Sequence, residues 1–316
     1  MPPIQWYDRC VVALPEITDR HMMRERYEAI SLGHNEVVLT FVTAGNRNRL
    51  TRAWTLLTLN EDLTLSETPF EVPPPLLKSE SAMTVCERCL VVYNYWERAN
   101  LYVFDLETRV WEAIVPSTDV APPKRLSTTL ITLSGRLLLI GGNDLCDVWT
   151  FDFGARRWIA LKYNIERPLC FCEKPMIFDH SCYLVGSRDG TKNNYGFRLS
   201  DFHGRDLTYT NEESVISTSS GLLRYYHAET HIGVGYRRVI LNALIGSLGG
   251  FPDAQVYDVV ACQISRAESI PVRCGGWGKG VTAAMLNPTT AVVVGYRDVV
   301  VVDIGSHLQV SEFFSD

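Results

Sequence analysis

Short apolar and alternating runs recur along the chain, separated by glycine and polar turn residues. The clearest set of four occupies residues 126–133, 136–140, 148–153 and 158–161. Ser134-Gly135 separates the first two runs, and Gly141-Gly142 follows the second. Alternation with a period of two, interrupted at these turn signals, predicts four short antiparallel strands. A glycine after the second strand is suited to a sharp exit with positive φ.

This set of strands belongs to a repeat. Phe104 and Trp111 are separated by seven positions, as are Phe151 and Trp158. An aspartate follows each phenylalanine, and its equivalents along the chain are Asn60, Asp105, Asp152, Asp201, Asp258 and Asp303. Six units of roughly 50 residues then account for nearly all 316 residues. Such a step favours radial repetition over an irregular all-β array, such as two packed sandwiches, which would also show short strands and glycine turns.

The third unit resembles a kelch repeat in its Arg125, double glycine Gly141-Gly142, and aromatic pair of Phe151 and Trp158. The second unit, with Phe104 and Trp111, is a weaker copy. The fifth is also weaker, with Gly249-Gly250 but no tryptophan. The resemblance implies an all-β fold, a six-bladed kelch-like β-propeller of four-stranded antiparallel blades.

The domain organisation follows from the repeat. Residues 27–316 are predicted to form a single six-bladed propeller, preceded by an N-terminal segment at residues 1–26. Within that segment, residues 5–14 have the pattern of an outer strand that would pair along a blade edge and close the ring. Residues 18–26 instead suit a short helix capped by Thr18 or Asp19.

Composition and charge restrict the function classes. The net charge is −6 and the sequence pI about 5.7, which argues against nucleic acid or an acidic membrane as the partner. No apolar run approaches the roughly 20 residues that span a bilayer, and the N-terminus lacks a signal-peptide core. Nine cysteines without regular spacing suit free thiols in a reducing compartment, so we expect a cytoplasmic protein.

Motifs for catalysis or cofactor binding do not occur in the sequence. It contains no phosphate-binding glycine loop, nucleophile elbow, His-Glu-x-x-His motif or dinucleotide fingerprint. Cys86 and Cys89 form a lone C-x-x-C motif without the second pair that a zinc site needs, so we expect them to pack inside strands. We therefore predict a non-catalytic protein without a cofactor.

One weak candidate for a metal site remains at His227, Glu229 and His231. Alternation along a strand would place these three side chains on one face, lining the central channel of a propeller. Neighbours on that face are about 6.5 to 7 Å apart, which is wide for ligands of one ion. A hydrated polar face is the simpler interpretation.

Strand topology also assigns loops to faces. The segments leading into first strands and the loops joining second to third strands must share one face, here called the rim. Cations and aromatics predicted on the rim are Arg26, Arg47, Arg49, Lys78, Tyr95, Trp96, Arg98, Arg125, Lys174, Arg188, Arg224, Tyr226, Trp277, Lys279, Tyr296 and Arg297. Arginines and exposed aromatics suit an acidic or phosphorylated segment of a partner protein. Alternatively, each cation is solvated or is a structural arginine that bonds neighbouring carbonyls.

The leading prediction is thus a protein–protein interaction scaffold or adaptor, as the kelch resemblance also implies. An enzyme or small-molecule or metal binder working in the channel is the second hypothesis, since some kelch propellers are enzymes. A structural subunit of a large complex is the third. The sequence specifies neither the partner's identity nor the oligomeric state.

Overall fold

A computed structural model describes the backbone over the strands and many of their connections. The described residues are 12–13, 27–45, 49–77, 81–94, 97, 100–125, 128–142, 145, 147–161, 176–178, 181–187, 194–202, 206–211, 228–234, 237–242, 253–258, 263–266, 282–294 and 298–303. Structural statements below concern these residues. Among them, no helix is long and apolar enough to cross a membrane.

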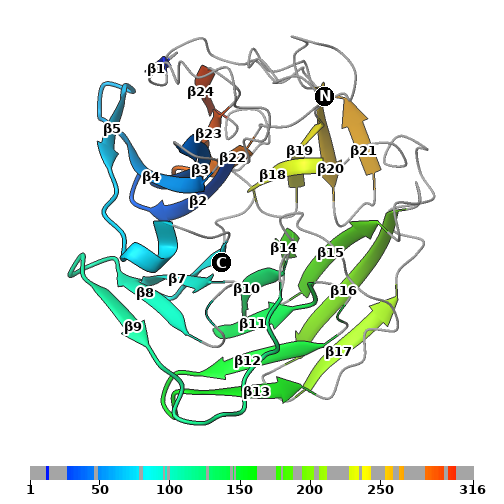
Figure 1. The fold of residues 1–316 in the computed structure, drawn as a ribbon. Coiled ribbons are helices and arrows are strands. Elements are labelled where there is room, and N and C mark those ends of the chain that lie inside the picture. Colours follow the sequence, from blue (N-terminus) through cyan, green and yellow to red (C-terminus); the bar gives the residue numbers. More distant parts are fainter. Residues whose placement is uncertain are drawn as a thin grey trace. The chain divides into compact units, whose positions relative to one another are not determined.

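Described strands form six four-stranded antiparallel sheets (Figure 1). Sheet 1 contains β2 (Tyr27–Gly33), β3 (Glu36–Gly45), β4 (Arg49–Leu59) and β5 (Leu65–Pro69). Sheet 2 contains β6 (Ser81–Cys86), β7 (Cys89–Asn94), β8 (Leu101–Asp105) and β9 (Trp111–Ile114). Sheet 3 contains β10 (Thr129–Leu133), β11 (Arg136–Ile140), β12 (Val148–Asp152) and β13 (Arg157–Leu161).

The remaining sheets have the same size. Sheet 4 contains β14 (Met176–Phe178), β15 (Ser181–Ser187), β16 (Asn194–Phe202) and β17 (Asp206–Asn211). Sheet 5 contains β18 (Ala228–Val234), β19 (Arg237–Asn242), β20 (Asp253–Asp258) and β21 (Gln263–Arg266). Sheet 6 contains β22 (Thr282–Met285), β23 (Thr290–Val294), β24 (Asp298–Asp303) and β1 (Val12–Ala13), and a 3-10 turn, η1 (Pro74–Leu77), precedes sheet 2. The prediction of an all-β fold made of four-stranded antiparallel sheets is confirmed.

The repeated aspartate marks the end of the third strand. Asp105 ends β8 and Asp152 ends β12. The Asp105 carboxylate accepts hydrogen bonds from the backbone N–H groups of Glu107 (2.9 Å) and Thr108 (2.8 Å). Asp152 likewise accepts one from the N–H of Ala155 at 2.9 Å. An aspartate that bonds the backbone two or three residues ahead favours a tight turn, which explains why the residue recurs.

The same turns share a backbone conformation. Arg109, in the turn between β8 and β9, has a φ of 60°. Arg156, in the corresponding turn of sheet 3, has a φ of 49°, and Leu63 in sheet 1 has a φ of 65°. These left-handed conformations cost a non-glycine residue about 1 kcal/mol. The repeat is therefore present in the local geometry even where the amino acids differ.

Sheet 6 is completed by the N-terminal part of the chain. Val12 pairs with Val299 and Ala13 with Asp298, antiparallel to β24. These two residues lie within residues 5–14, where the sequence predicts an outer strand that pairs along a sheet edge. The alternative helix at residues 18–26 lies outside the described residues.

Two compact units account for the chain: residues 1–71 with 226–316, and residues 72–225. In the first unit, sheets 1 and 6 share a core that includes Val37, Leu39, Leu57, Val292 and Val294. Across this joint the N–H of Ala29 also donates to the Thr282 hydroxyl at 3.1 Å. The first unit thus joins strands from both ends of the sequence.

In the second unit, sheets 2 and 3 pack through one core. Val91 and Leu101 from sheet 2 meet Leu137, Leu139 and Trp158 from sheet 3. All five of these side chains are buried, none more than 2% exposed. This core supports the connections at the end of sheet 3, where the best-defined polar site lies.

Candidate functional site

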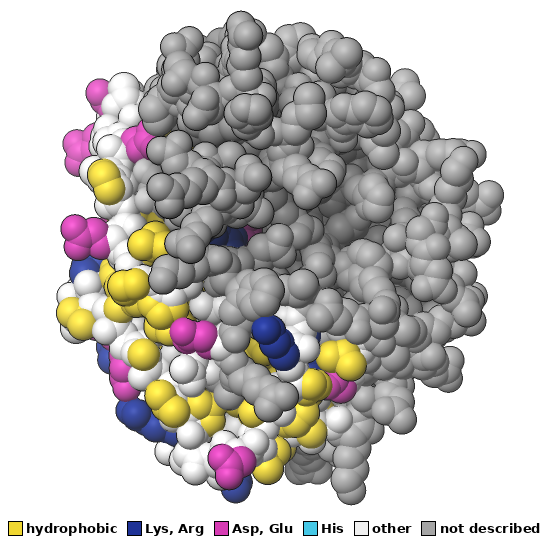
Figure 2. All heavy atoms as spheres, viewed as in Figure 1, with side chains coloured by type: hydrophobic (Ala, Val, Ile, Leu, Met, Phe, Trp, Pro, Cys, Tyr) yellow, Lys and Arg dark blue, Asp and Glu magenta, His cyan; other side chains and the backbone are white. Residues whose placement is uncertain are grey.

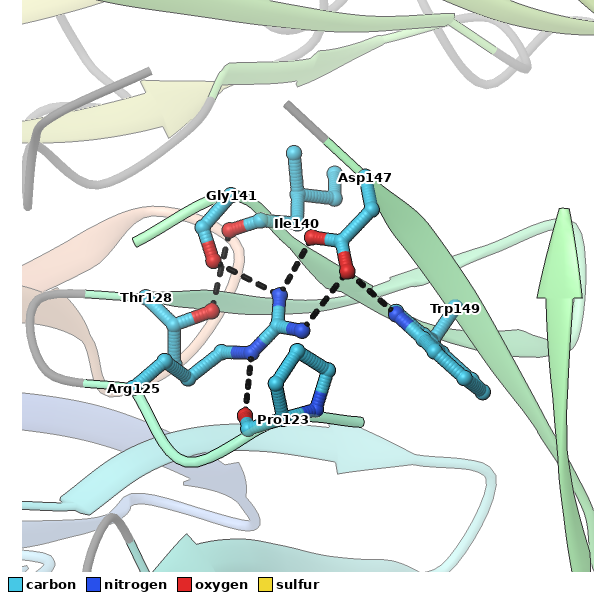
Figure 3. A network of polar contacts seen from close by, with 7 residues as sticks. All are labelled: Pro123, Arg125, Thr128, Ile140, Gly141, Asp147 and Trp149. Atoms are coloured by element: carbon cyan, nitrogen blue, oxygen red, sulfur yellow. Dashed lines mark hydrogen bonds and ion pairs between the residues drawn. The ribbon is translucent and has the colours of Figure 1, made fainter. Parts of the chain in front are cut away.

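A buried arginine organises the connection between β11 and β12 (Figure 3). Arg125 Nη1 donates to the Gly141 carbonyl at 2.8 Å and to Asp147 Oδ1 at 2.7 Å. Its Nη2 donates to Asp147 Oδ2 at 2.8 Å, and its Nε to the Pro123 carbonyl at 3.1 Å. Gly141 directly follows β11 and Asp147 directly precedes β12. The guanidinium therefore holds both ends of this connection.

Local sequence explains how the connection reaches the arginine. Gly141 and Gly142 have φ values of 57° and 96°, which confirms the positive φ expected after the second strand. The Gly141 N–H donates to the Asp147 carbonyl at 3.0 Å, and the Thr128 hydroxyl donates to the Ile140 carbonyl at 2.9 Å. The backbone polar groups at the end of β11 are thus paired.

Hydrogen bonds and a neighbouring charge in this network lower the pKa of the Asp147 carboxyl. Partial burial alone would raise the pKa of Asp147, but hydrogen bonds from Arg125 and Trp149 and the charge of Arg125 outweigh it, so that the pKa is lowered. Trp149 Nε1 donates to Asp147 Oδ2 at 2.6 Å. Asp147 is accordingly a carboxylate at neutral pH, with two of its three described donors on Arg125.

Arg125 was expected on the partner-binding rim, and that assignment is wrong. Its side chain is 0% exposed, and its donors are directed at carbonyls and a carboxylate of the same sheet. The alternative interpretation, a structural arginine that bonds neighbouring carbonyls, describes it correctly. Asp147 was not predicted to be the partner of Arg125, although this aspartate stands two residues before Trp149 in the third repeat unit.

Most other predicted rim residues are not described. Arg49 is the first residue of β4, where it pairs with Gly45. The residues outside the described part are Arg26, Arg47, Lys78, Tyr95, Trp96, Arg98, Lys174, Arg188, Arg224, Tyr226, Trp277, Lys279, Tyr296 and Arg297. On the face drawn in Figure 2, the described Lys and Arg side chains are interspersed with Asp, Glu and hydrophobic ones. A cationic rim therefore stays a prediction.

The two ends of the sheets nevertheless differ in the lengths of most strand connections. At the hairpin edge, first and second strands are joined by residues 34–35, 87–88, 134–135, 179–180, 235–236 and 286–289. At the loop edge, second and third strands are joined by residues 46–48, 95–100, 141–147, 188–193, 243–252 and 295–297. The connections between first and second strands have two residues in five of the six sheets, and the third-to-fourth turns at the same edge have three to five, whereas loop-edge connections have three to ten. Length variation is concentrated at the edge to which the rim was assigned.

The aromatic pairs of the repeat are confirmed as packing units. Phe104 lies opposite Trp111 across β8 and β9, with ring centroids 5.1 Å apart. Phe151 lies opposite Trp158 across β12 and β13, at 5.0 Å. Trp158 is 2% exposed and its ring also meets the edge of Tyr93. These residues fix the outer strands onto the core.

The weak metal candidate receives no geometric support. His227 lies outside the described residues, while Glu229 and His231 lie on β18. The register of β18 shifts between Ala228 and Thr230, so Glu229 occupies an irregularity where strict alternation is interrupted. Among residues whose placement is described, no group of three metal-ligating side chains occurs.

The C-x-x-C motif lies at the hairpin edge of sheet 2. Cys86 ends β6, Cys89 begins β7, and the two residues pair directly. Cys86 is buried and Cys89 half-buried against the core of sheets 2 and 3. Burial raises the pKa of both thiols. The expectation that these cysteines pack inside strands is confirmed.

Taken together, repeated four-stranded sheets, aspartate-capped turns and a strand from the N-terminal part of the chain that completes sheet 6 define an all-β protein. No family model matches the chain, and no curated protein matches its sequence. Among solved structures, the chain is similar to one described as "Structure of YjhT", with a TM-score of 0.58 and 9% sequence identity. The match covers 89% of this chain and 94% of the other. At that identity the similarity concerns the fold alone.

Proposed function

We propose that the six sheets are the blades of one kelch-like β-propeller and that the protein is a non-catalytic interaction scaffold. Its loop edge would bind an acidic or phosphorylated segment of a partner protein. Support for six blades comes from the six four-stranded sheets, the aspartate that ends the third strand in four of them, and the completion of sheet 6 by β1. The free thiols of Cys86 and Cys89 favour a reducing compartment, the cytoplasm.

The observation that carries the proposal is the difference between the two edges. A rigid sheet with short hairpins at one end and longer, unequal connections at the other can vary its recognition surface at little cost in stability. The loop-edge connections of sheets 1, 2, 4 and 6 contain the arginines Arg47, Arg98, Arg188 and Arg297. A guanidinium binds carboxylate or phosphate through paired N–H donors, which is the chemistry that an acidic segment requires.

At the hairpin edge, two described cations, Arg88 and Arg156, have acidic partners. Arg88 Nη1 lies 3.0 Å from Glu107 Oε2, and Arg156 Nη2 lies 2.9 Å from Glu112 Oε1. All four side chains are more than half exposed, so each ion pair is screened by water and contributes little to stability. Arginines at the hairpin edge are consequently suitable for control substitutions that change the net charge without altering the loop edge.

The test is a charge reversal at the loop edge. The variant carries Arg47→Glu, Arg98→Glu, Arg188→Glu and Arg297→Glu, and its binding is measured on immobilised peptides that contain phosphoserine, phosphothreonine or runs of aspartate and glutamate. We expect at least a tenfold loss of affinity for the peptides that the unaltered protein binds, because each reversal replaces a charge-assisted contact with repulsion.

The matched control reverses the same number of charges at the hairpin edge, with Arg88→Glu, Arg109→Glu, Arg156→Glu and Arg157→Glu. It has the same net charge as the test variant and should retain binding. Circular dichroism and a thermal melt establish that both variants fold. Equal losses in the two variants would assign the effect to net charge, and an unaltered protein that binds no acidic peptide would refute the proposal.

A further inference from the structure

The Cys86-x-x-Cys89 motif has a geometry that its role in packing does not require. The two residues face each other at the end of the β6–β7 hairpin, separated along the chain only by Glu87 and Arg88. Glu87 has a φ of 53°, so the turn adopts a left-handed conformation without a glycine. The hairpin therefore brings the two cysteines into direct cross-strand register.

Both side chains lie on the same side of sheet 2. Cys86 belongs to the core shared with sheet 3, and Cys89 packs against that core. Opposite residues of an antiparallel pair have Cα atoms about 4.5 to 5.5 Å apart. A disulfide needs a Cα separation of about 4.4 to 6.8 Å. The backbone of the reduced hairpin already satisfies this requirement.

We propose that Cys86 and Cys89 are a reversible redox pair, which forms a cross-strand disulfide on exchange with a low-molecular-weight disulfide such as oxidised glutathione. The half-buried Cys89 reacts first. Its thiolate attacks one sulfur of the oxidant, forming a mixed disulfide and releasing one reduced glutathione. Cys86 then loses its proton and attacks the sulfur of Cys89, which releases the second reduced glutathione. The two protein thiols supply two electrons and two protons, and the oxidant accepts both.

The surroundings of the pair determine how fast this exchange runs. Burial raises the pKa of both thiols. The charges of Asp105 and Glu87 raise the pKa of Cys89 further, whereas Arg88 opposes them. The side chain of Thr132 in sheet 3 opposes the rise in the pKa of Cys86, whereas the charge of Glu87 adds to it. Only a small fraction is thiolate at neutral pH, so the exchange should be slow and should accelerate as pH rises.

The site also connects to the rest of the hairpin edge. The backbone carbonyl of Arg88 accepts a hydrogen bond from the Leu106 N–H at 2.9 Å, which links this turn to the next one in sheet 2. A disulfide would therefore covalently restrain a turn that already supports its neighbour. It would lie at the hairpin edge and leave the loop edge free, so the redox pair and the proposed partner site can be tested separately.

The sequence offers a direct assay. Lys78, Arg88 and Arg98 are trypsin sites, so Cys86 falls in the peptide of residues 79–88 and Cys89 in the peptide of residues 89–98. The folded full chain is equilibrated with mixtures of oxidised and reduced glutathione, its remaining thiols are blocked with N-ethylmaleimide, and it is digested without reductant. We expect mass spectrometry to find the two peptides joined, in an amount that rises with the oxidised fraction and vanishes after dithiothreitol.

The kinetics and two variants complete the test. The rate of joining should rise roughly tenfold from pH 7 to pH 8, because the thiolate fraction does so below the pKa. In Cys86→Ala the Cys89 peptide should retain glutathione as a stable mixed disulfide, and Cys89→Ser should contain neither adduct nor link at that position. A wild-type protein whose Cys89 peptide is blocked or glutathionylated, but never joined to the Cys86 peptide at the highest oxidant ratio, would overturn the proposal.

Discussion

Replacing Arg125 with methionine tests whether the buried network stabilises sheet 3. The side chain is 0% exposed and donates four hydrogen bonds, two of them to the Asp147 carboxylate. Methionine fills much of the volume but leaves the Gly141 carbonyl and the Asp147 charge without this partner. Breaking one member of a buried ion pair costs about 3 to 5 kcal/mol. Asp147 is 32% exposed and can recover part of its solvation, so we expect a loss of about 3 kcal/mol.

The assay is thermal unfolding of the full chain followed by circular dichroism. An unfolding entropy of about 2 cal/mol/K per residue converts a loss of about 3 kcal/mol into a fall of about 5 °C in Tm. Arg125→Lys should recover only part of this, because an ammonium cannot make the paired contact with Asp147. Arg88→Met is the matched control: Arg88 is 71% exposed, and its ion pair with Glu107 should contribute less than about 1 kcal/mol.

A double-mutant cycle separates the charge pair from the loss of packing. Combining Arg125→Met with Asp147→Asn should cost less than the sum of the single changes, since removing both charges leaves neither one buried alone. A coupling of about 1 kcal/mol or more is expected. Additive effects, or an Arg125→Met variant as stable as Arg88→Met, would refute the view that the network holds the β11–β12 connection.

Three further changes examine other parts of the fold. Trp158→Ala, which empties a buried site against Phe151, should cost about 3 to 5 kcal/mol in urea unfolding, and the more exposed Trp111→Ala should cost clearly less. Arg109→Gly should raise the free energy of unfolding by up to about 1 kcal/mol, since glycine accepts a φ of 60°, whereas Arg109→Ala should not. Because the folded pKa of Asp147 is lowered, its stabilisation is present above the unfolded value of about 4 and is lost as pH falls through the folded pKa. Asp147→Asn should therefore weaken the dependence of Tm on pH below about 4.

Local pattern predicted the four strands of sheet 3. The run at residues 136–140 became β11 with the same bounds, since apolar residues between a Ser-Gly turn and a double glycine leave few alternatives. Asp105 and Asp152 recur at equivalent positions of the sequence, and each makes its described turn hydrogen bonds within three residues. Features that depend on residues only a few positions apart, such as short strands and turns, can be predicted from sequence.

Features that depend on distant groups were harder to predict. Arg125 was placed correctly before the first strand of its unit, but its burial depends on Gly141 and Asp147, 16 and 22 positions further along. The register shift beside Glu229 likewise depends on the pairing of β18 with β19, and a sequence that alternates does not reveal it. Residues 5–14 had the pattern of a strand, yet only the fold identifies β24 as the partner of Val12 and Ala13.

The pairing of Val12 with Val299 sets an order of events during synthesis. Residues 72–225 form a unit from one continuous stretch of the chain. All strands of this unit therefore leave the ribosome one after another, and the unit can fold before the rest of the chain is translated. The other unit must keep β1 unpaired until β24 has emerged, after almost the whole described chain has been translated. Ribosome-bound chains stalled before residue 298 should therefore protect sheets 2 and 3 from proteolysis while the edge of sheet 6 is still missing. The appearance of β24 would then decide when β1 becomes part of a sheet.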